Sequence, residues 1–539
     1  MCVAMPEVGL AAAQPGHAGR VATPLRLVPL SPQPVRVNGL HRYFGTIELE
    51  AASDGLTVVD VLPLERYLLG LNEVPPDWPV EALRAQSVAA RTYSLWTLAH
   101  EPAGAAAIYG FDICASVQCQ VFSGADVVRA RQGARWAQAV RSTAGRAVTF
   151  AGRPILARYH STSGGVTLKN SDAFAGSPDL PYLQPVPSGL ERGSPFFRWR
   201  AEFGLDDLRK MLTSAGWWPA GGGRLTEAST VGSSEGLHYP DVVLEGRGRR
   251  LRITAEELRA ALREHAPRLR PARYPSFTPT GVRLPETLPS NRIEVETSAG
   301  TVTIRGRGWG HGVGMSQWGA RGMALRGATY EDILTHYYQG TTVAEAPSPG
   351  RVRVGLAWAR PSVAAFGAFR IVDGRGNLVA RRALGTWTFA WAGPHAIELR
   401  APRGWGRPPG LALERIPVTV PAGGTVRLRF RLAAPARVRA EASGPGPVTT
   451  AVAIKDSGSR RLRWRAPKRP GRYRLVLVAS DGAGRAASEP RTIVVVAPPR
   501  RDRRSAPGPW ANVAIAIAGA ALLALLAVGA SSFAGTIRK

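Results

Sequence analysis

The sequence predicts three kinds of region in order: an N-terminal region that mixes strands and helices, an all-β region, and a C-terminal transmembrane helix. Strand and helix patterns follow one another through the first part of the chain, and a region of strict polar and apolar alternation comes next. No charged residue lies between Arg504 and Arg538. With 539 residues, the chain is long enough for about two to four domains.

The N-terminal region begins with residues 1–28, which lack clear periodicity and are predicted to form a flexible lead-in. Alternating apolar residues separated by Gly and Asn predict strands over 34–62. A helix is predicted over 79–98, with Pro79 in its first turn and Asp77 as its cap. Further helical patterns cover 205–215, 255–264 and a stretch that ends at Tyr337-Tyr338.

The second region is predicted to be β-structure throughout. In two runs, apolar residues alternate strictly with arginines, as expected for half-buried antiparallel strands whose arginines face solvent. We therefore expect a β-rich domain over 349–420 and an immunoglobulin-like (Ig-like) β-sandwich over 421–497. The apolar residues of these runs are Val426, Leu428, Phe430 and Leu432 in the first and Leu462 and Trp464 in the second.

The C-terminal segment has the length and composition of a membrane span. After a basic, Pro-rich linker over 498–510, residues 511–534 are almost wholly apolar, and about 20 apolar residues cross a bilayer. A short basic tail, 535–539, follows. Arginines are more frequent before the span than after it, which alone would place the large N-terminal part in the cytoplasm. No signal peptide is evident at the N-terminus, so the orientation stays open.

The formal net charge is +30, which raises the question of nucleic-acid binding. Only five of the 69 basic residues are Lys, and no compact basic cluster is interleaved with aromatic residues. We therefore expect no nucleic-acid partner. The charge would instead draw the protein to anionic polymers and lipid headgroups. Three Cys residues exclude a disulfide-dense scaffold and a multi-zinc protein.

Four stretches carry candidate chemistry, and together they resemble the SpoIID/LytB family, the sporulation stage II protein D group of bacterial cell-wall proteins. The resemblance spans about residues 34–345 in the family's order, and its most specific part is Gly-Trp-Gly-His-Gly-Val-Gly-Met-Ser-Gln. The four stretches are 62–93 (Leu-Pro-Leu-Glu-Arg-Tyr-Leu through Glu73 to Arg-Thr-Tyr), 112–122, 159–165 and 308–320.

The resemblance implies an α+β catalytic domain over 29–348 with an extended glycan groove. It implies a lytic transglycosylase that needs no cofactor and cuts peptidoglycan between N-acetylmuramic acid and N-acetylglucosamine. The muramyl 6-hydroxyl closes on C1 to give a 1,6-anhydro end, and the sporulation member prefers strands stripped of stem peptides. The implied partners are glycan strands and a cell-wall amidase. The alternative is a non-enzymatic amidase enhancer.

With the predicted C-terminal span, the resemblance implies a single-pass cell-membrane protein whose catalytic part lies outside and faces the wall. Ring closure needs one carboxyl group, which protonates the leaving oxygen and then takes the 6-hydroxyl proton. That group must be partly desolvated so that its pKa rises. By motif position Glu73 matches the family's catalytic Glu. For Glu65 we expect a structural hydrogen bond or salt bridge, and Glu81 suits a first helical turn.

The remaining motif residues are candidates for substrate binding. Gln86 and Arg91 either hold N-acetyl groups or stabilise charge, or they serve helix packing, and Tyr93 ends the same motif. A serine nucleophile is not expected beside His160, because the nucleophile-elbow pattern is missing. The His311 segment either lines the sugar cleft or is a structural glycine turn. The cleft candidates are His160, Ser161, Ser163, Gly164, Gly165, His311, Gly312, Gly314, Met315, Ser316 and Gln317.

Cys114 and Cys119 have two interpretations. Some members of the family bind zinc here through two Cys and two His. In this sequence Gln118 precedes the second Cys, and no His lies between His100 and Cys114, so the local ligand set is broken. In an exported protein a short disulfide is the simpler interpretation. We therefore favour a disulfide and expect no metal.

Overall fold

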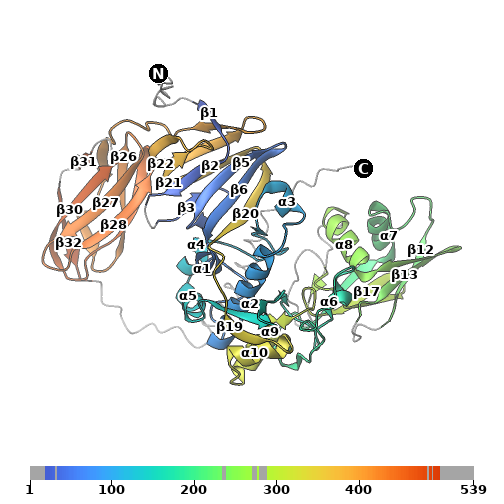
Figure 1. The fold of residues 1–539 in the computed structure, drawn as a ribbon. Helices are drawn as coiled ribbons and strands as arrows, with labels where there is room; N and C mark the ends of the chain where they lie inside the picture. Colours follow the sequence, from blue (N-terminus) through green and yellow to red (C-terminus); the bar gives the residue numbers. More distant parts are fainter. Residues whose placement is uncertain are drawn as a thin grey trace, which may run out of the picture.

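A large β-sheet forms the centre of the molecule, with a second β-rich unit beside it, helices beneath it and a smaller mixed unit at the far end (Figure 1). In this computed structural model the described residues are 18–30, 33–232, 238–269, 276–277, 288–481, 485–487 and 490–497.

The large sheet has eleven strands, in the order β1-β23-β22-β21-β2-β5-β6-β20-β7, and β3 pairs with β21 and with β4. It therefore combines strands from the N-terminus with strands about 300 residues later in the chain. The strands are β1 (Ala18–Ala22), β2 (Leu25–Pro29), β3 (Val35–Val37), β4 (Arg42–Tyr43), β5 (Thr46–Ala52), β6 (Gly55–Pro63), β7 (Ile113–Cys114), β20 (Arg351–Arg360), β21 (Ser362–Val372), β22 (Leu378–Trp391) and β23 (Ala396–Arg400).

This sheet corrects two predicted boundaries. The predicted lead-in 1–28 contains β1 and β2, and Leu25 and Leu27 are fully buried in the core. The predicted division at residue 349 separates β20 from its antiparallel partner β6 and β21 from its antiparallel partner β2. The strands on either side of that division bury their apolar faces in one common core, so they form one folded unit.

The helical layer is centred on α2 (Val80–Leu98), which packs against α5 (Gly133–Ser142), α9 (Gln317–Leu325) and α10 (Tyr330–Tyr337). The predicted helix over 79–98 is therefore confirmed. The prediction of Asp77 as its cap is wrong, because Pro79 occupies the N-cap position and no side chain caps the helix. Shorter elements of this layer are α1 (Leu64–Leu69), α3 (Ala105–Tyr109), α4 (Ala125–Arg129), β8 (Arg146–Phe150), β9 (Arg153–Pro154), β10 (Tyr159–His160), α6 (Asn170–Ala173), the 3-10 turn Gly189–Glu191, β18 (Met315–Ser316) and β19 (Thr342–Glu345).

The smaller mixed unit is built from residues 198–307 and has a core of its own around Trp199, Leu208 and Ile304. One sheet has the order β15-β11-β17-β16 and the other β12-β13-β14. The two helical patterns predicted here are confirmed by α7 and α8. The elements are β11 (Arg198–Gly204), α7 (Leu205–Ser214), β12 (Leu225–Val231), β13 (Asp241–Gly246), β14 (Arg249–Thr254), α8 (Ala255–Leu269), β15 (Ser276–Phe277), β16 (Ile293–Ser298) and β17 (Thr301–Arg307).

The second β-rich unit consists of two sheets that share one core containing Phe430, Trp464 and Leu477. One sheet has the order β25-β32-β30-β27-β28, with β31 beside β30, and the other has the order β24-β26-β29. The predicted alternation is confirmed, because the apolar residues of β26 are buried and its arginines are exposed. The strands are β24 (Leu411–Arg415), β25 (Thr419–Pro421), β26 (Thr425–Leu432), β27 (Ala436–Ser443), β28 (Thr449–Lys455), β29 (Gly458–Arg465), β30 (Gly471–Ser480), β31 (Arg485–Ala487) and β32 (Arg491–Val496).

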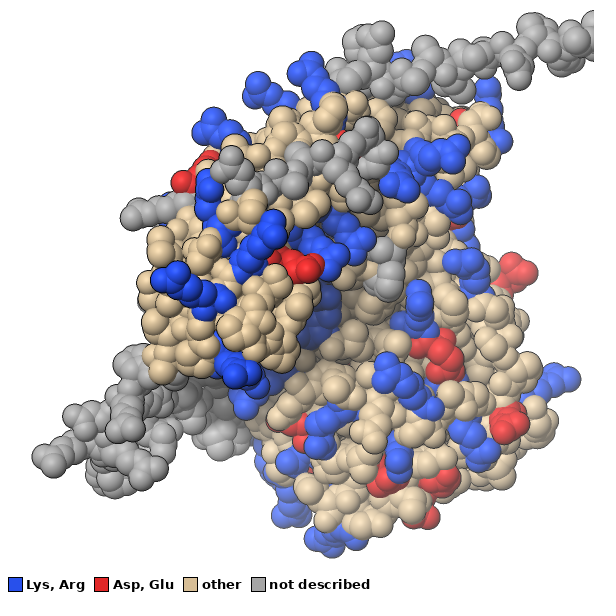
Figure 2. Space-filling view, turned by 90° about the vertical axis from the view of Figure 1, so that its left-hand side faces the viewer, with Lys and Arg blue, Asp and Glu red and all other residues tan. Residues whose placement is uncertain are grey.

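We call this unit the sandwich; its immunoglobulin-like assignment stays a prediction. Figure 2 shows basic side chains spread over this end of the molecule, with few acidic ones among them. The predicted linker 498–510, transmembrane helix 511–534 and tail 535–539 lie outside the described residues. Among the helices that are described, none has the length and apolar character needed to cross a bilayer.

Candidate active site

Glu73 lies in the loop between α1 and α2, and a short antiparallel contact holds this loop in place. Leu71 forms a β-bridge with Phe122, and the Asn72 amide donates to the Val121 carbonyl at 2.8 Å. The Glu73 Oε1 atom accepts one hydrogen bond from the Val121 amide at 2.6 Å and one from the Tyr159 hydroxyl at 3.1 Å. The carboxyl group is thus fixed by two segments that are distant in sequence.

The surroundings of Glu73 favour its protonated form. Burial raises the pKa of Glu73 to about 7, although hydrogen bonds from Val121, Tyr159 and Gln317 act in the opposite direction. Burial also raises the pKa values of Tyr67 and Tyr159, and the nearby Glu73 charge raises both further. The carboxyl group is therefore ready to give up or take a proton near neutral pH among phenols that stay protonated.

Gln317 connects Glu73 to Gln86. The Gln317 side chain hydrogen-bonds to Glu73, and its Nε2 donates to Gln86 Oε1 at 3.3 Å. Gln86 is buried on α2, and its Nε2 has no hydrogen-bond partner among the described residues. Of the predicted substrate-binding residues, Gln317 is therefore beside the candidate acid, whereas Gln86 reaches it through Gln317.

An aromatic pair lies on the two segments that carry Glu73 and Gln317. Trp78 and Trp318 meet edge to face with ring centroids 5.2 Å apart, and the Arg321 guanidinium lies over both rings. Tyr93 is half-buried, and its pKa is raised by burial and, to a smaller extent, by the charge of Glu73.

Arg91 has a structural role, which is one of the two alternatives that the sequence left open for it. It is buried, and its Nε and a terminal nitrogen donate to the two carboxyl oxygens of Glu65 at 2.7 and 2.8 Å. It also donates to the carbonyls of Arg146 and Val140. The ion pair expected of Glu65 is thus confirmed, and it occupies the guanidinium that the prediction assigned to the glycan.

Glu191, which the sequence did not single out, organises the Ser163 and Ser316 segments. It is fully buried and accepts hydrogen bonds from the Ser163 amide at 2.8 Å, the Ser163 hydroxyl at 2.6 Å, the Gly165 amide at 2.6 Å and the Ser316 hydroxyl at 2.5 Å. These donors are 26 to 125 residues away in sequence, so no local pattern could identify the contact. Substrate-binding roles for Ser163, Gly165 and Ser316 are corrected to this internal network.

His160 and His311 form a second enclosed group, with ring centroids 5.5 Å apart. Burial lowers the pKa of His160 to about 4 and that of His311 well below its usual value. His160 Nδ1 lies 3.1 Å from the Val313 carbonyl, and His311 Nδ1 accepts from the Val313 amide. Both rings are therefore neutral near pH 7, and both contact the backbone of Val313.

The glycine-rich segment serves close packing, which was the structural alternative at these positions. β10 and β18 pair in parallel, with Tyr159 opposite Met315 and His160 opposite Ser316. Gly314 has φ +70°, and a Cβ there would lie 2.1 Å from the Arg158 carbonyl. The remaining predicted cleft residues are placed as follows: Met315, Gly312 and Gly164 are buried, and Ser161 is half-buried with its carbonyl accepting from the Trp318 amide.

Cys114 and Cys119 form a disulfide, which confirms that interpretation over zinc. Within the described residues, no group of three or more His, Cys, Asp or Glu is arranged to hold a metal ion. The next residue, Gln120, is fully buried, accepts from the Tyr67 hydroxyl at 2.9 Å and donates to the Ala90 carbonyl at 3.1 Å. The disulfide loop thus leads into the segment whose Val121 amide holds Glu73.

Comparison with known proteins shows which family the chain resembles. Residues 52–150, which include Glu73, match the family model described as SpoIID, Stage II sporulation protein. The chain is 30% identical over 303 residues to Stage II sporulation protein D of Bacillus amyloliquefaciens, covering 54% of this chain and 76% of that protein.

Two further relatives match over about the same number of residues. The corresponding protein of Bacillus subtilis (strain 168) is 30% identical over 301 residues, covering 53% of this chain and 76% of that protein. The Amidase enhancer of the same strain is 26% identical over 301 residues, which is 50% of this chain and 39% of that protein.

Proposed function

Because the chain belongs to the SpoIID/LytB family and so has a cell-wall-related role, we propose that it is a peptidoglycan lytic transglycosylase in which Glu73 is the acid and then the base. The observation that carries the proposal is the Glu73 carboxyl group, whose pKa burial raises to about 7. The groups that hydrogen-bond to it are a backbone amide, a phenol and a carboxamide.

A single carboxyl group suits elimination to a 1,6-anhydro sugar better than hydrolysis with water. Ordinary glycosidases place two carboxyl groups about 5 to 9 Å apart, one of which activates water or attacks the sugar. In the proposed reaction protonated Glu73 donates its proton to the glycosidic oxygen, and the bond from C1 to that oxygen breaks. The resulting carboxylate then takes the proton of the muramyl 6-hydroxyl while that oxygen bonds to C1.

The neighbours of Glu73 have matching roles in this scheme. Tyr159 and the Val121 amide stabilise the carboxylate after it has donated its proton, because both donate hydrogen bonds to Oε1. Gln317, held by Gln86, orients the carboxyl group and adds a further stabilising hydrogen bond. These donors lower a pKa that burial alone would raise further, and so keep it near neutrality.

The test is mass spectrometry of the products that the purified full-length chain forms from amidase-stripped glycan strands, beside a Glu73→Gln variant. The full chain is needed because β20 to β23 complete the large sheet. Anhydro-muramyl ends from the wild type alone would support the proposal. Ordinary reducing ends would mean hydrolysis by water and would overturn the ring-closure mechanism.

The similarity to Amidase enhancer supports a second candidate, a wall protein that stimulates a partner amidase without cutting glycan. This candidate predicts no product from either protein on stripped or intact strands, together with faster peptide release when a cell-wall amidase is added. Either function would require the part of the chain that carries Glu73 to face the cell wall. An extracellular position beside the membrane is therefore part of the proposal.

A further inference from the structure

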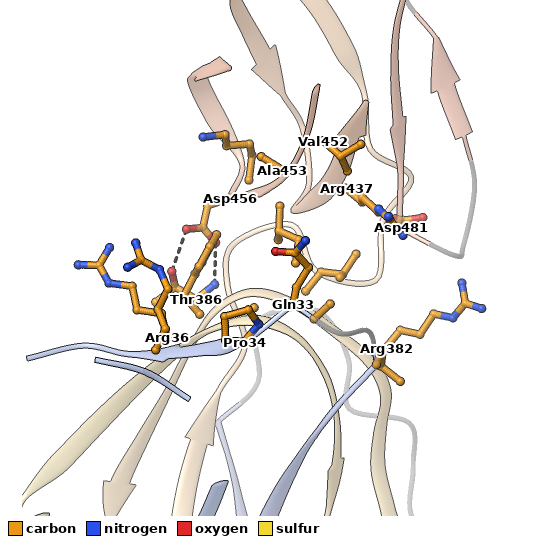
Figure 3. Close-up of a pocket in the computed structure, with 18 of the residues that line it drawn as sticks. Gln33, Pro34, Arg36, Arg382, Thr386, Arg437, Val452, Ala453, Asp456 and Asp481 are labelled. Carbon is orange, nitrogen blue, oxygen red and sulfur yellow. Dashed lines mark hydrogen bonds between the residues drawn. The ribbon is translucent and has the colours of Figure 1, made fainter. Parts of the chain in front are cut away.

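A cavity of about 1520 Å³ lies between the large sheet and the sandwich (Figure 3). One wall comes from β3, β21 and β22, and the other from β27, β28 and the loop that follows β28. The two walls are joined by Asp456, whose carboxyl oxygens accept from the Thr386 amide at 2.7 Å and its hydroxyl at 2.8 Å. Gly385 permits this approach, since a Cβ there would lie 2.4 Å from Asp456 Oδ1.

The lining of this cavity is strongly basic. Seven Lys or Arg side chains line it against two carboxylates, Asp456 and Asp481. Figure 3 shows Arg36 and Arg382 on the large-sheet wall and Arg437 on the sandwich wall. Positive charge thus faces the space from both walls.

Most of these cations have no ion-pair partner among the described residues. Arg42 pairs with Asp126, and Arg460 donates to backbone carbonyls, so their charges are engaged. The other five make no ion pair within the described part of the chain: Arg36, Arg129, Arg382, Arg437 and Lys455. An anion in the cavity would supply the charge that the protein does not.

Lys455 lies beside a second cation of the same wall. It is half-buried, and its pKa is lowered by burial and by the neighbouring Arg460. An anion bound beside these two groups would reduce their mutual repulsion.

The shape of the space indicates a chain-like ligand. A second hollow of about 580 Å³ adjoins the first and shares Arg437, Val452 and Ser480 with it. The first hollow alone exceeds the roughly 300 to 1,000 Å³ of small-molecule pockets. Among the described residues of the first lining, Phe366 is the one aromatic residue, so they offer few of the stacking surfaces that single-stranded nucleic acids use.

We propose that this cleft binds a segment of a phosphodiester polymer without nucleobases, such as a polyol phosphate chain. Guanidinium groups match phosphate oxygens in pairs, and a charge on every repeat would meet arginines on both walls in turn. Apolar side chains such as Val452 between the charges suit the carbon segments of such a polymer. The site is distinct from Glu73, so this inference does not rest on the proposed function.

The test measures binding of an end-labelled glycerol phosphate oligomer to the purified full-length chain by fluorescence anisotropy over a range of salt concentrations. The test variant is Arg36→Gln with Arg437→Gln, one exposed residue from each wall. The matched control is Arg427→Gln with Arg463→Gln, an exposed cross-strand pair on the other sheet of the sandwich. Both variants lose two positive charges, so a difference between their affinities would have to come from a binding site in the cleft.

We expect the test variant to bind the oligomer at least about tenfold more weakly than the wild type. The slope of the logarithm of its binding constant against the logarithm of salt concentration should fall by about two. The control should bind nearly as tightly as the wild type. Equal weakening in both variants would mean attraction to net charge alone and would overturn the proposal. Equally tight binding of poly-glutamate would overturn the phosphate assignment. Tighter binding of oligothymidylate would make the cleft a nucleic-acid site. Glycan cutting by the test variant should be unchanged, which separates this test from that of Glu73.

Discussion

Glu73 and Glu191 are two enclosed carboxyl groups in the same fold, and the number of donors around each sets them apart. Glu191 accepts four hydrogen bonds from the Ser163, Gly165 and Ser316 positions, which engage both of its oxygens. Glu73 Oε1 accepts from Val121 and Tyr159, and burial still raises its pKa to about 7. Many donors make a carboxylate a structural anchor, whereas few donors in a desolvated loop leave it able to exchange a proton.

The largest expected effect is on catalysis. Glu73→Gln should lower the rate of anhydro-muramyl formation by at least about 100-fold, because the amide cannot donate the required proton. The measurement is product formation over time by mass spectrometry. Glu81→Gln is the matched control, since Glu81 pairs with Arg84 and caps the Tyr330 amide instead. A Glu73→Gln variant that cuts at the wild-type rate would remove Glu73 from the mechanism.

For Glu191, the expected effect is on stability and not on catalysis. Glu191→Gln should lower the free energy of unfolding by about 3 kcal/mol, because its amide group would face the donors that now bind a carboxylate. Urea unfolding at constant pH measures this. If the loss were within about 0.5 kcal/mol, as for an ordinary surface substitution, Glu191 would not be the anchor described above.

A third expectation concerns the pH dependence of stability. The folded protein holds the Glu73 proton more tightly than the unfolded chain, with a pKa of about 7 against an ordinary 4.5. Its contribution to stability is therefore fully present below pH 4.5 and is lost as the pH rises through 7.

The free energy of unfolding of the Glu73→Gln variant, taken relative to that of the wild type, should therefore increase by up to about 3 kcal/mol between low and high pH. Urea unfolding of both proteins at about pH 4 and about pH 8 measures the difference. Comparing the two proteins cancels other buried acids, such as Asp60, whose pKa burial raises to about 8. A difference independent of pH would contradict the raised pKa.

The smallest expected effect tests the role of the hydrogen-bond donors around Glu73. Tyr159→Phe removes a hydrogen bond that stabilises the carboxylate, so the pKa of Glu73 should rise and the pH–rate profile should move to higher pH. The rate at the optimum should fall by less than about tenfold. Tyr338→Phe removes a buried hydroxyl that donates to the Arg158 carbonyl and should leave the profile in place. Equal profiles for both variants would mean that Tyr159 is structural.

The sequence correctly predicted the elements whose signals are local. The period of α2, the alternation of β26 and β29 and the cysteine pair all depend on residues close together in the chain. The sequence motifs were enough to identify the family, and the role of Glu73 as the acid stays a prediction. The internal partners of Arg91, Ser163 and Ser316 were not predicted, because motif membership does not reveal whether a side chain faces a groove or an internal partner.

By itself the sequence determined the family, the candidate acid and the two-faced strands of the sandwich. The tertiary structure decided that strands of 18–63 and 351–400 form one sheet, that Glu191 is an anchor, and that arginines of two units line one cleft. The reason is physical: periodicity records which face of an element is apolar. Which distant face covers it, and which donor reaches a buried carboxylate, depends on closing loops of up to about 300 residues.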